Sequence, residues 1–182
     1  MSQTSCGVSD QEFAAFTRYC NQSDNENDNK RRARLLGFSA EGVKVAPGAI
    51  VRIRDNQPGR NVFIGLYSYI NGDVTIGDNV LIGPHCNITA GHHAFDPATG
   101  WFSARTPASE NPIVIGDGSW LAAGCTVTAG VRIGRCNLLC ANCVVTADTQ
   151  DYAIMAGTPA RQIGRVDAAT GEYHWFREAP LS

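Results

Sequence analysis

The sequence predicts an all-β protein built as a parallel β-helix, in which the chain winds into stacked coils of short strands. Three observations support this prediction. Aliphatic residues recur at every sixth position, small or β-branched residues recur two positions before them, and glycine often follows the aliphatic position, with Asp or Asn next. A fixed period of this kind is typical of repeat folds, in which each unit packs on its neighbours.

The aliphatic series contains only Ile, Leu and Val: Ile64, Ile70, Ile76, Ile82, Ile88, Ile115, Leu121, Val127, Ile133, Leu139 and Val145. The second series is expected to share the interior: Val62, Ser68, Val74, Val80, Cys86, Ile113, Ser119, Cys125, Val131, Asn137 and Cys143. Six residues suit one short strand and one tight turn. Three units are therefore expected to close a triangular coil, with coils stacked about 4.8 Å apart.

One segment must leave the coils, because the distance from Ile88 to Ile115 is not a multiple of six positions. The segment 94–108 is rich in Pro, Ser, Thr and Gly and contains Trp101 and Phe102, so it is the predicted loop. Loops of this length inside a compact domain are usually functional.

Two helices are predicted before the coils, each from a Ser that is followed three positions later by Glu. The pairs are Ser9 with Glu12 and Ser23 with Glu26, the pattern of a capping box. The second helix is expected to end near Gly37.

The six-residue phase breaks after Gln150, and a short element near residues 172–177 is expected to cover the open end of the coils. We therefore divide the chain into an N-terminal helical segment (1–42), a β-helix (43–150, with the loop 94–108) and a C-terminal cap (151–182).

Charge and composition narrow the classes of function. The 15 basic and 17 acidic residues nearly cancel, which argues against nucleic acid or an anionic membrane as a partner. No run of about 18 apolar residues occurs, and the N-terminus lacks the features of an export signal. We therefore expect a cytoplasmic protein without a membrane partner, and reduced thiols for its odd number of cysteines, 7.

The cysteines could suggest a metal site, because Cys136, Cys140 and Cys143 are closely spaced. However, Cys86, Cys125 and Cys143 fall in the interior series, which points them away from Cys136 and Cys140. Four thiolates cannot converge from that arrangement as a zinc site requires. We expect reduced thiols and no metal.

Four stretches between about residues 61 and 166 resemble the galactoside and maltose O-acetyltransferases of the hexapeptide-repeat family. They are residues 74–82, Thr89-Ala90-Gly91-His92, residues 115–120 and residues 155–161. The resemblance implies a left-handed β-helix, although right-handed crossovers are the general rule. It also implies a homotrimer that uses acetyl-CoA as cosubstrate and a small, sugar-like hydroxyl compound as acceptor.

The resemblance further implies direct transfer, in which a histidine takes the proton from the acceptor hydroxyl as it attacks the thioester. His92 aligns with that histidine and is the expected general base, with His93 as its nearest competitor. Both could instead be polar residues at the edge of a coil. His85 is interpreted as structural and His174 as a packing residue.

The resemblance also implies the coenzyme contacts. The backbone N–H of Ala123, just beyond Trp120, would stabilise the oxyanion, and Trp120 either shapes the site or fills a corner. Pantetheine would lie between two prisms near Ala141 and Thr146. The coenzyme phosphates would face basic residues after the last coil, at the positions Arg161 and, because Gly164 replaces the family's next basic residue, Arg165.

Other functions remain open or are excluded at this point. A γ-type carbonic anhydrase is excluded, since its zinc site needs histidines on later coils and none occurs between Ala94 and Tyr173. An N-acetyltransferase acting on an amino sugar or antibiotic and a non-enzymatic scaffold both remain possible. The identity of the acceptor is not determined by the sequence.

Overall fold

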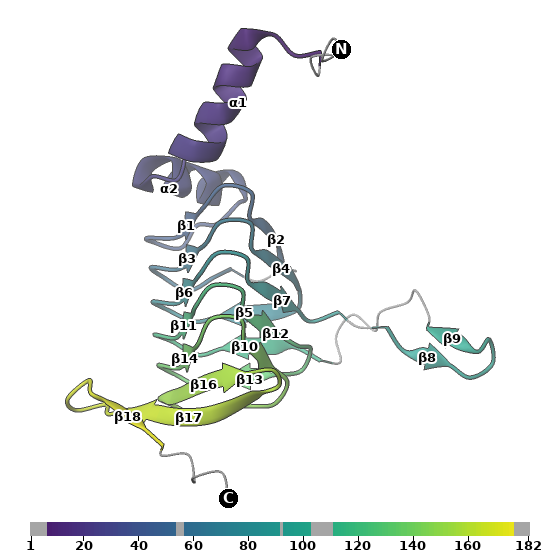
Figure 1. Ribbon diagram of the computed structural model, residues 1–182, viewed down its shortest axis with the longest axis vertical. Coiled ribbons are helices and arrows are strands. Elements are labelled where there is room, and N and C mark those ends of the chain that lie inside the picture. The colour runs from purple at the N-terminus through teal and green to yellow at the C-terminus, as the bar shows by residue number, and fades with distance from the viewer. Residues whose placement is uncertain (1–6, 54–56, 92, 103–110, 177–182) are drawn as a thin grey trace, which may run out of the picture.

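The computed structural model describes residues 7–53, 57–91, 93–102 and 111–176. The chain folds as a left-handed parallel β-helix of about 5 turns, which confirms the predicted fold class. Two helices lie at the N-terminal end of the coils, and antiparallel strands lie at the C-terminal end (Figure 1).

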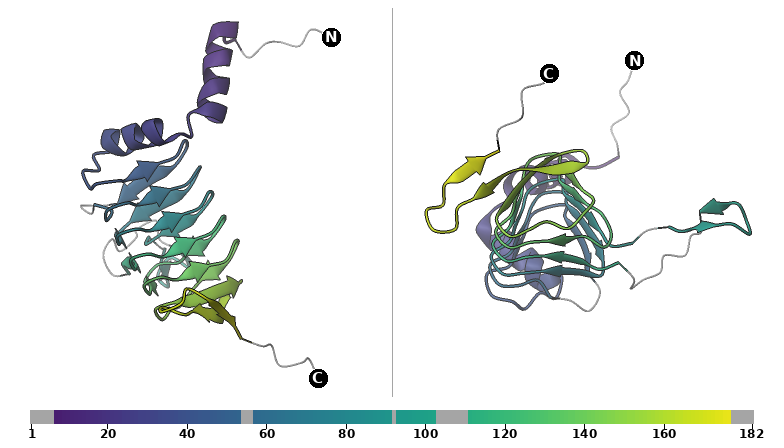
Figure 2. Two further views of the ribbon diagram at one scale, coloured as in Figure 1. Left: turned by 90° about the vertical axis from the view of Figure 1, so that its left-hand side faces the viewer. Right: turned by 90° about the horizontal axis from the view of Figure 1, so that it is seen from below.

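Three parallel sheets form the three walls of a prism (Figure 2). Wall A contains β1 (Lys44–Val45), β3 (Phe63–Ile64), β6 (Leu81–Ile82), β11 (Trp120–Leu121) and β14 (Leu138–Leu139). Wall B contains β2 (Ile50–Ile53), β4 (Tyr69–Gly72), β7 (Asn87–Thr89), β12 (Thr126–Val127) and β15 (Val144–Val145). Wall C contains β5 (Val74–Ile76), β10 (Ile113–Ile115) and β13 (Arg132–Ile133). The chain passes from A to B to C in each coil.

The interior of the prism is filled by the two predicted series. Every member of both series is at most 3 % exposed, and the aliphatic residues of neighbouring coils lie in register, as Ile64, Ile82 and Leu121 do on wall A. In neighbouring strands, aliphatic residues therefore stack on aliphatic residues. The interior side chains of each coil are covered by those of the next coil. The strands β1 and β2 add a further coil before the first member of either series.

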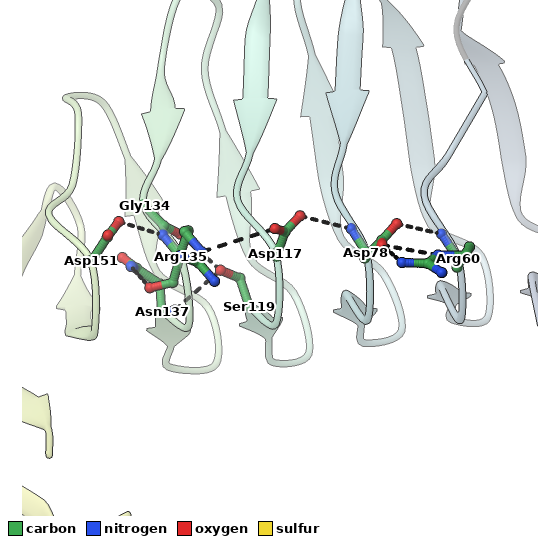
Figure 3. Close-up of polar contacts among 8 residues, drawn as sticks. All are labelled: Arg60, Asp78, Asp117, Ser119, Gly134, Arg135, Asn137 and Asp151. Atoms are coloured by element: carbon green, nitrogen blue, oxygen red, sulfur yellow. Dashed lines mark hydrogen bonds and ion pairs between the residues drawn. The ribbon is translucent and has the colours of Figure 1, made fainter. Parts of the chain in front are cut away.

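A polar ladder holds the turns together where wall C leads into wall A, an edge that we call corner CA (Figure 3). In three of the turns, an Asp carboxylate accepts a backbone N–H from the turn of the preceding coil. Asp78 accepts the Arg60 N–H, Asp117 accepts the Asp78 N–H, and Asp151 accepts the Arg135 N–H. The Arg60 guanidinium also donates to Asp78, and this hydrogen bond lowers the pKa of that carboxyl. These Asp residues thus join one coil to the next.

The first helix, α1 (Asp10–Gln22), begins as predicted: the Ser9 hydroxyl accepts the Glu12 N–H at 3.3 Å, and the Glu12 carboxylate accepts the Ser9 N–H at 2.8 Å. No residue of α1 is buried, and the helix stands away from the prism (Figure 1). The predicted capping box at Ser23 is wrong. Its hydroxyl donates to the Tyr19 carbonyl at the end of α1, 2.5 Å away.

The second helix, α2 (Glu26–Leu35), is capped instead by Asn25, whose side chain accepts the Asp28 N–H at 3.0 Å. The helix ends just before Gly37, as expected. It lies against the first coil, because Ala33 is buried in the core and the Arg32 guanidinium donates to the Val45 carbonyl at 2.8 Å. In the described part of the chain, neither helix is long and apolar enough to cross a membrane.

The predicted loop leaves the prism after wall B and forms a hairpin of β8 (Phe95–Asp96) and β9 (Trp101–Phe102) that projects from the coils (Figure 1). Its three aromatic residues, Phe95, Trp101 and Phe102, are all more than half exposed. The remainder of the loop, from residue 103, lies outside the described residues.

The C-terminal end of the coils is closed by β16 (Ala153–Gly157) and β17 (Ala160–Val166), whose Ala153, Met155 and Ala160 join the core. The element expected near residues 172–177 forms β18 (Tyr173–Trp175), which pairs with β17. However, β18 is exposed along its whole length, so the expectation that it covers the coils is wrong. It extends the sheet edge instead.

The interior cysteines Cys86, Cys125 and Cys143 are buried, whereas Cys136 and Cys140 are half-buried. The Sγ atoms of Cys125 and Cys143 lie 3.7 Å apart. Hydrogen bonds with the Cys143 and Cys86 thiols, and then burial, raise the pKa of Cys125. Within the described ranges, no group of three or more His, Cys, Asp or Glu residues is arranged to hold a metal ion.

Candidate active site

The turns that join wall A to wall B form a second long edge of the prism, which we call corner AB. Backbone hydrogen bonds connect the successive turns: Tyr67 N–H to Pro47, His85 N–H to Leu66, Gly124 N–H to Pro84 and Asn142 N–H to Ala123, over 2.8 to 3.2 Å. Two of the predicted site residues, Ala123 and Ala141, lie on this corner in neighbouring coils, and both are exposed.

The N–H of Ala123 is an available donor. Within the described part of the chain it donates to no acceptor, although the Ala123 carbonyl accepts the Asn142 N–H at 2.9 Å. In the preceding coil the residue equivalent to Ala123 is Pro84, which has no N–H. The ladder of corner AB thus does not use this group, which is the arrangement that an oxyanion donor needs.

Thr146 lies at the opposite end of wall B. It directly follows β15, in the coil next to Thr128, whose N–H donates to the Val145 carbonyl at 3.1 Å. His93 is exposed and follows β7 shortly after the same end of wall B. His92, the expected general base, lies outside the described residues.

The predicted residues therefore occupy two different edges of one chain. Ala123 and Ala141 lie on corner AB, whereas Thr146 and His93 lie where wall B ends, with the strands of wall B between them. A single chain does not bring these residues together.

Trp120 lies on the outer surface of wall A and is 47 % exposed, so it does not fill the interior of the prism. It is in register with Leu81 in the preceding coil and with Leu138 in the next, and Phe63 precedes Leu81. These four residues form an apolar strip along the outside of wall A, which we call the wall A strip. Leu81 is also about half exposed.

The two predicted phosphate ligands, Arg161 and Arg165, lie on β17 and are exposed. The Thr158 hydroxyl just before β17 donates to the Asn142 carbonyl, which places the start of β17 at the end of corner AB. Neither arginine forms an ion pair with a described carboxylate. One nitrogen of the Arg161 guanidinium donates to the Ala160 carbonyl at 2.9 Å, and both guanidinium groups keep further donors for an anion.

The structure explains why position 164 is a glycine. A Cβ at this position would lie 2.6 Å from the His174 carbonyl oxygen on β18, so the close pairing of β17 with β18 requires glycine. His174 itself lies opposite Arg165 and has a side chain that is 52 % exposed, 3.8 Å from Asp167. The interpretation of His174 as a packing residue is therefore wrong.

Sequence reasoning did not single out one feature of corner AB. The rings of Tyr67 and His85 stack there with centroids 5.6 Å apart and an interplanar angle of 14°. A signal for them was present, because both aromatic residues stand at the turn position that Gly48, Gly124 and Asn142 occupy in the other coils of corner AB.

Comparison with known proteins supports the predicted family. The family described as bacterial transferase hexapeptide (six repeats) matches residues 59–90, and the one described as hexapeptide repeat of succinyl-transferase matches residues 112–147. Nodulation protein L of Rhizobium meliloti is 34% identical over 137 residues, which cover 70% of this chain and 73% of that protein. The chain belongs to the hexapeptide-repeat acetyltransferase family.

Two further relatives are informative. Galactoside O-acetyltransferase of Escherichia coli is 30% identical over 125 residues, 64% of this chain and 60% of the relative. A hexapeptide-repeat acetyltransferase from Vibrio cholerae, solved in complex with acetyl coenzyme A, is 27% identical with a TM-score of 0.51, and the match covers 91% of this chain and 94% of that one. The chain spans between 44% and 63% of the length of four curated relatives that it matches.

Proposed function

We propose that the protein is an acetyl-CoA-dependent acetyltransferase that acts as a homotrimer and O-acetylates a sugar-like hydroxyl acceptor. The observation that carries the proposal is the free Ala123 N–H on corner AB, in line with Ala141 and with the arginines of β17. A long thioester cosubstrate with phosphates at one end fits such a line. The family relative solved with acetyl coenzyme A supports the choice of cosubstrate.

In the proposed reaction, His92 accepts the proton of the acceptor hydroxyl while the hydroxyl oxygen bonds to the thioester carbon. The negative charge that develops on the carbonyl oxygen is stabilised by the Ala123 N–H. The intermediate then collapses, the carbon–sulfur bond breaks, and the imidazolium returns its proton to the thiolate. The products are the acetyl ester and free CoA. No metal is required.

A homotrimer is proposed because the candidate site residues lie on two separate edges of one chain. The end of wall B in one chain, with Thr146 and His93, would face corner AB of its neighbour, with Ala123 and Ala141. Three such heterologous contacts can close into a ring. The exposed wall A strip supports this proposal, because apolar side chains in register offer a surface for a second chain.

Between the facing edges of two chains, the pantetheine arm of the coenzyme would pass Trp120 and Ala141. The coenzyme phosphates would meet Arg161 and Arg165. Arginine suits this role, since its planar guanidinium forms paired hydrogen bonds with phosphate oxygens. We also propose a cytoplasmic location, where the cosubstrate is supplied and cysteines stay reduced.

The test is release of free CoA thiol from acetyl-CoA across a panel of sugars, nucleotide sugars and amino sugars, with the products identified by mass. An O-acetylated sugar is the expected product. Transfer only to amines would replace the proposal with N-acetylation, and transfer only from another acyl-CoA would change the donor. A protein that binds no acetyl-CoA and transfers no acetyl group would be a scaffold.

A further inference from the structure

The last strand of the sheet, β18, carries a pair of stacked aromatic rings. Tyr173 and Trp175 lie two positions apart on this strand, and their ring centroids are 6.2 Å apart with an interplanar angle of 27°. The two residues are 53% and 57% exposed. Rings exposed to this extent leave surface on which a further flat group can stack.

The fold does not use these two rings. No residue of β18 belongs to the hydrophobic core, and the strand is exposed along its whole length. Its pairing with β17 is made by backbone groups and sets Tyr173 and Trp175 opposite Val166 and Gly164. Packing against the prism therefore does not account for an aromatic pair at this place.

The strand pairing places Trp175 on the same face of the sheet as Trp120. Side chains of directly paired residues project from the same face of a sheet. From Trp120 the row of paired residues continues, strand by strand, through Leu138, Ile154, Gly164 and Trp175. This face is the outer surface of wall A. The aromatic pair thus lies on the face that carries the wall A strip, beyond the end of the coils (Figure 1).

Arg161 projects from this face as well. It pairs with Ala156 on β16, two positions after Ile154, and alternate residues of a strand point to the same side. On β17, Gly164 follows Arg161 closely and lies opposite Trp175. The candidate phosphate ligand and the aromatic pair are therefore neighbours on one face of the sheet.

The sites along this face follow the order of the groups in the coenzyme. In the proposed function the thioester lies at Ala123, just after β11, and the pantetheine arm passes Ala141, just after β14. The phosphates meet Arg161 on β17, and β18 is the next strand of the sheet. Adenosine follows the phosphates in acetyl-CoA, so its flat base would reach the strand that carries the aromatic pair.

We propose that Trp175 and Tyr173 bind the adenine base of acetyl-CoA by stacking, with Trp175 nearer to the phosphates. The inference rests on the proposed function and adds to it two residues that select for the nucleotide part of the cosubstrate. Both residues lie beyond the stretch from 61 to 166 that resembles the family, so the resemblance does not imply them.

The experiment compares acetyl-CoA with acetyl-phosphopantetheine, which keeps the thioester and a phosphate but has no adenosine. Kd is measured by calorimetry, and kcat and KM by thiol release, in the wild type and in Trp175→Leu. For acetyl-CoA we expect Kd and KM to rise roughly fivefold to tenfold, the lower end of a base–aromatic stacking contribution because the site is exposed. The kcat at saturating acetyl-CoA and the kcat/KM for acetyl-phosphopantetheine should not change.

Two further variants make the result specific. Phe176→Leu is the matched control, because Phe176 is 51% exposed and directly follows β18, and the alternation of side chains turns it to the other face. It should change neither affinity. Trp175→Tyr keeps an aromatic ring and should retain most of the affinity for acetyl-CoA.

Three results overturn the inference. Trp175→Leu keeps the wild-type Kd for acetyl-CoA, or it weakens acetyl-CoA and acetyl-phosphopantetheine equally, or Phe176→Leu has the same effect. Light scattering and a thermal melt accompany each variant. A change in the number of chains in Trp175→Leu would also overturn it, since the ring would then be a contact between subunits.

Failure of the proposed function gives a different pattern. A wild type whose binding of acetyl-CoA depends on Trp175, but which transfers no acetyl group, keeps the inference and loses the proposed activity. Acetyl transfer with an affinity that is insensitive to Trp175→Leu overturns only the inference. A wild type that binds no acetyl-CoA overturns both.

Discussion

Replacing Ala123 by proline should remove a catalytic hydrogen bond without disturbing the fold. The corner AB positions equivalent to Ala123 in two earlier coils are Pro47 and Pro84, each followed by a residue with positive φ, as Ala123 is followed by Gly124. Proline therefore fits the local geometry. The substitution also breaks no hydrogen bond of the described structure, because the Ala123 N–H donates to none.

The expected effects on stability and on rate differ in sign. A proline that fits its site stabilises a protein by about 0.4–1 kcal/mol, because the unfolded chain loses conformational freedom. Loss of one oxyanion donor costs about 100-fold to 1000-fold in kcat, or about 2.7–4 kcal/mol of transition-state stabilisation. Ala123→Pro should thus melt at or above the wild-type Tm while turnover almost disappears.

The assay is thiol release at saturating acetyl-CoA, with the acceptor found in the panel, alongside a thermal melt. Ala123→Ser is the matched control, since it changes the side chain but keeps the N–H, and it should retain most of the activity. A folded Ala123→Pro protein with wild-type kcat would refute the assignment of this N–H as the oxyanion donor.

Three other predictions concern the rest of the site. His92→Ala should lower kcat by about 10² to 10⁴-fold and leave acetyl-CoA binding and Tm intact, with a milder effect for His93→Ala; the reverse result would move the base by one residue. Replacing Arg161 and Arg165 together by Ala should raise the KM for acetyl-CoA with a modest loss of kcat, and an unchanged coenzyme affinity would place the phosphates elsewhere. Light scattering should report three chains, and a dilute, active monomer would contradict the two-chain site.

The helix boundaries show where local sequence reasoning succeeds and fails. The capping box at Ser9 was predicted correctly, because both partners lie within one turn of the helix and nothing else competes for them. At Ser23 the same pattern misled, since Asn25 caps α2 and the end of α1 engages the Ser23 hydroxyl. Which residue caps a helix depends on which nearby side chains are not already hydrogen-bonded elsewhere. For α2 this is decided only once α1 is in place.

The phosphate-binding segment shows a similar limit. The sequence pointed to Arg161 and Arg165, and both are exposed on β17. It did not explain Gly164, because the need for glycine arises from β18, which packs against this position only after the chain turns back. His174 was misjudged for the same reason.

The sequence by itself determined the fold, because each six-residue unit carries its own interior residues and its own turn. The interior residue of a unit, such as Ile82, is buried by contact with the neighbouring units alone. The sequence did not determine on which wall the chain re-enters after the loop. Pairing of β10 with β5 returns it to wall C, and this places Ala123 one coil from His85 on corner AB. Tertiary structure alone decided that neighbourhood, since the loop breaks the six-residue phase and only the pairing of strands restores it.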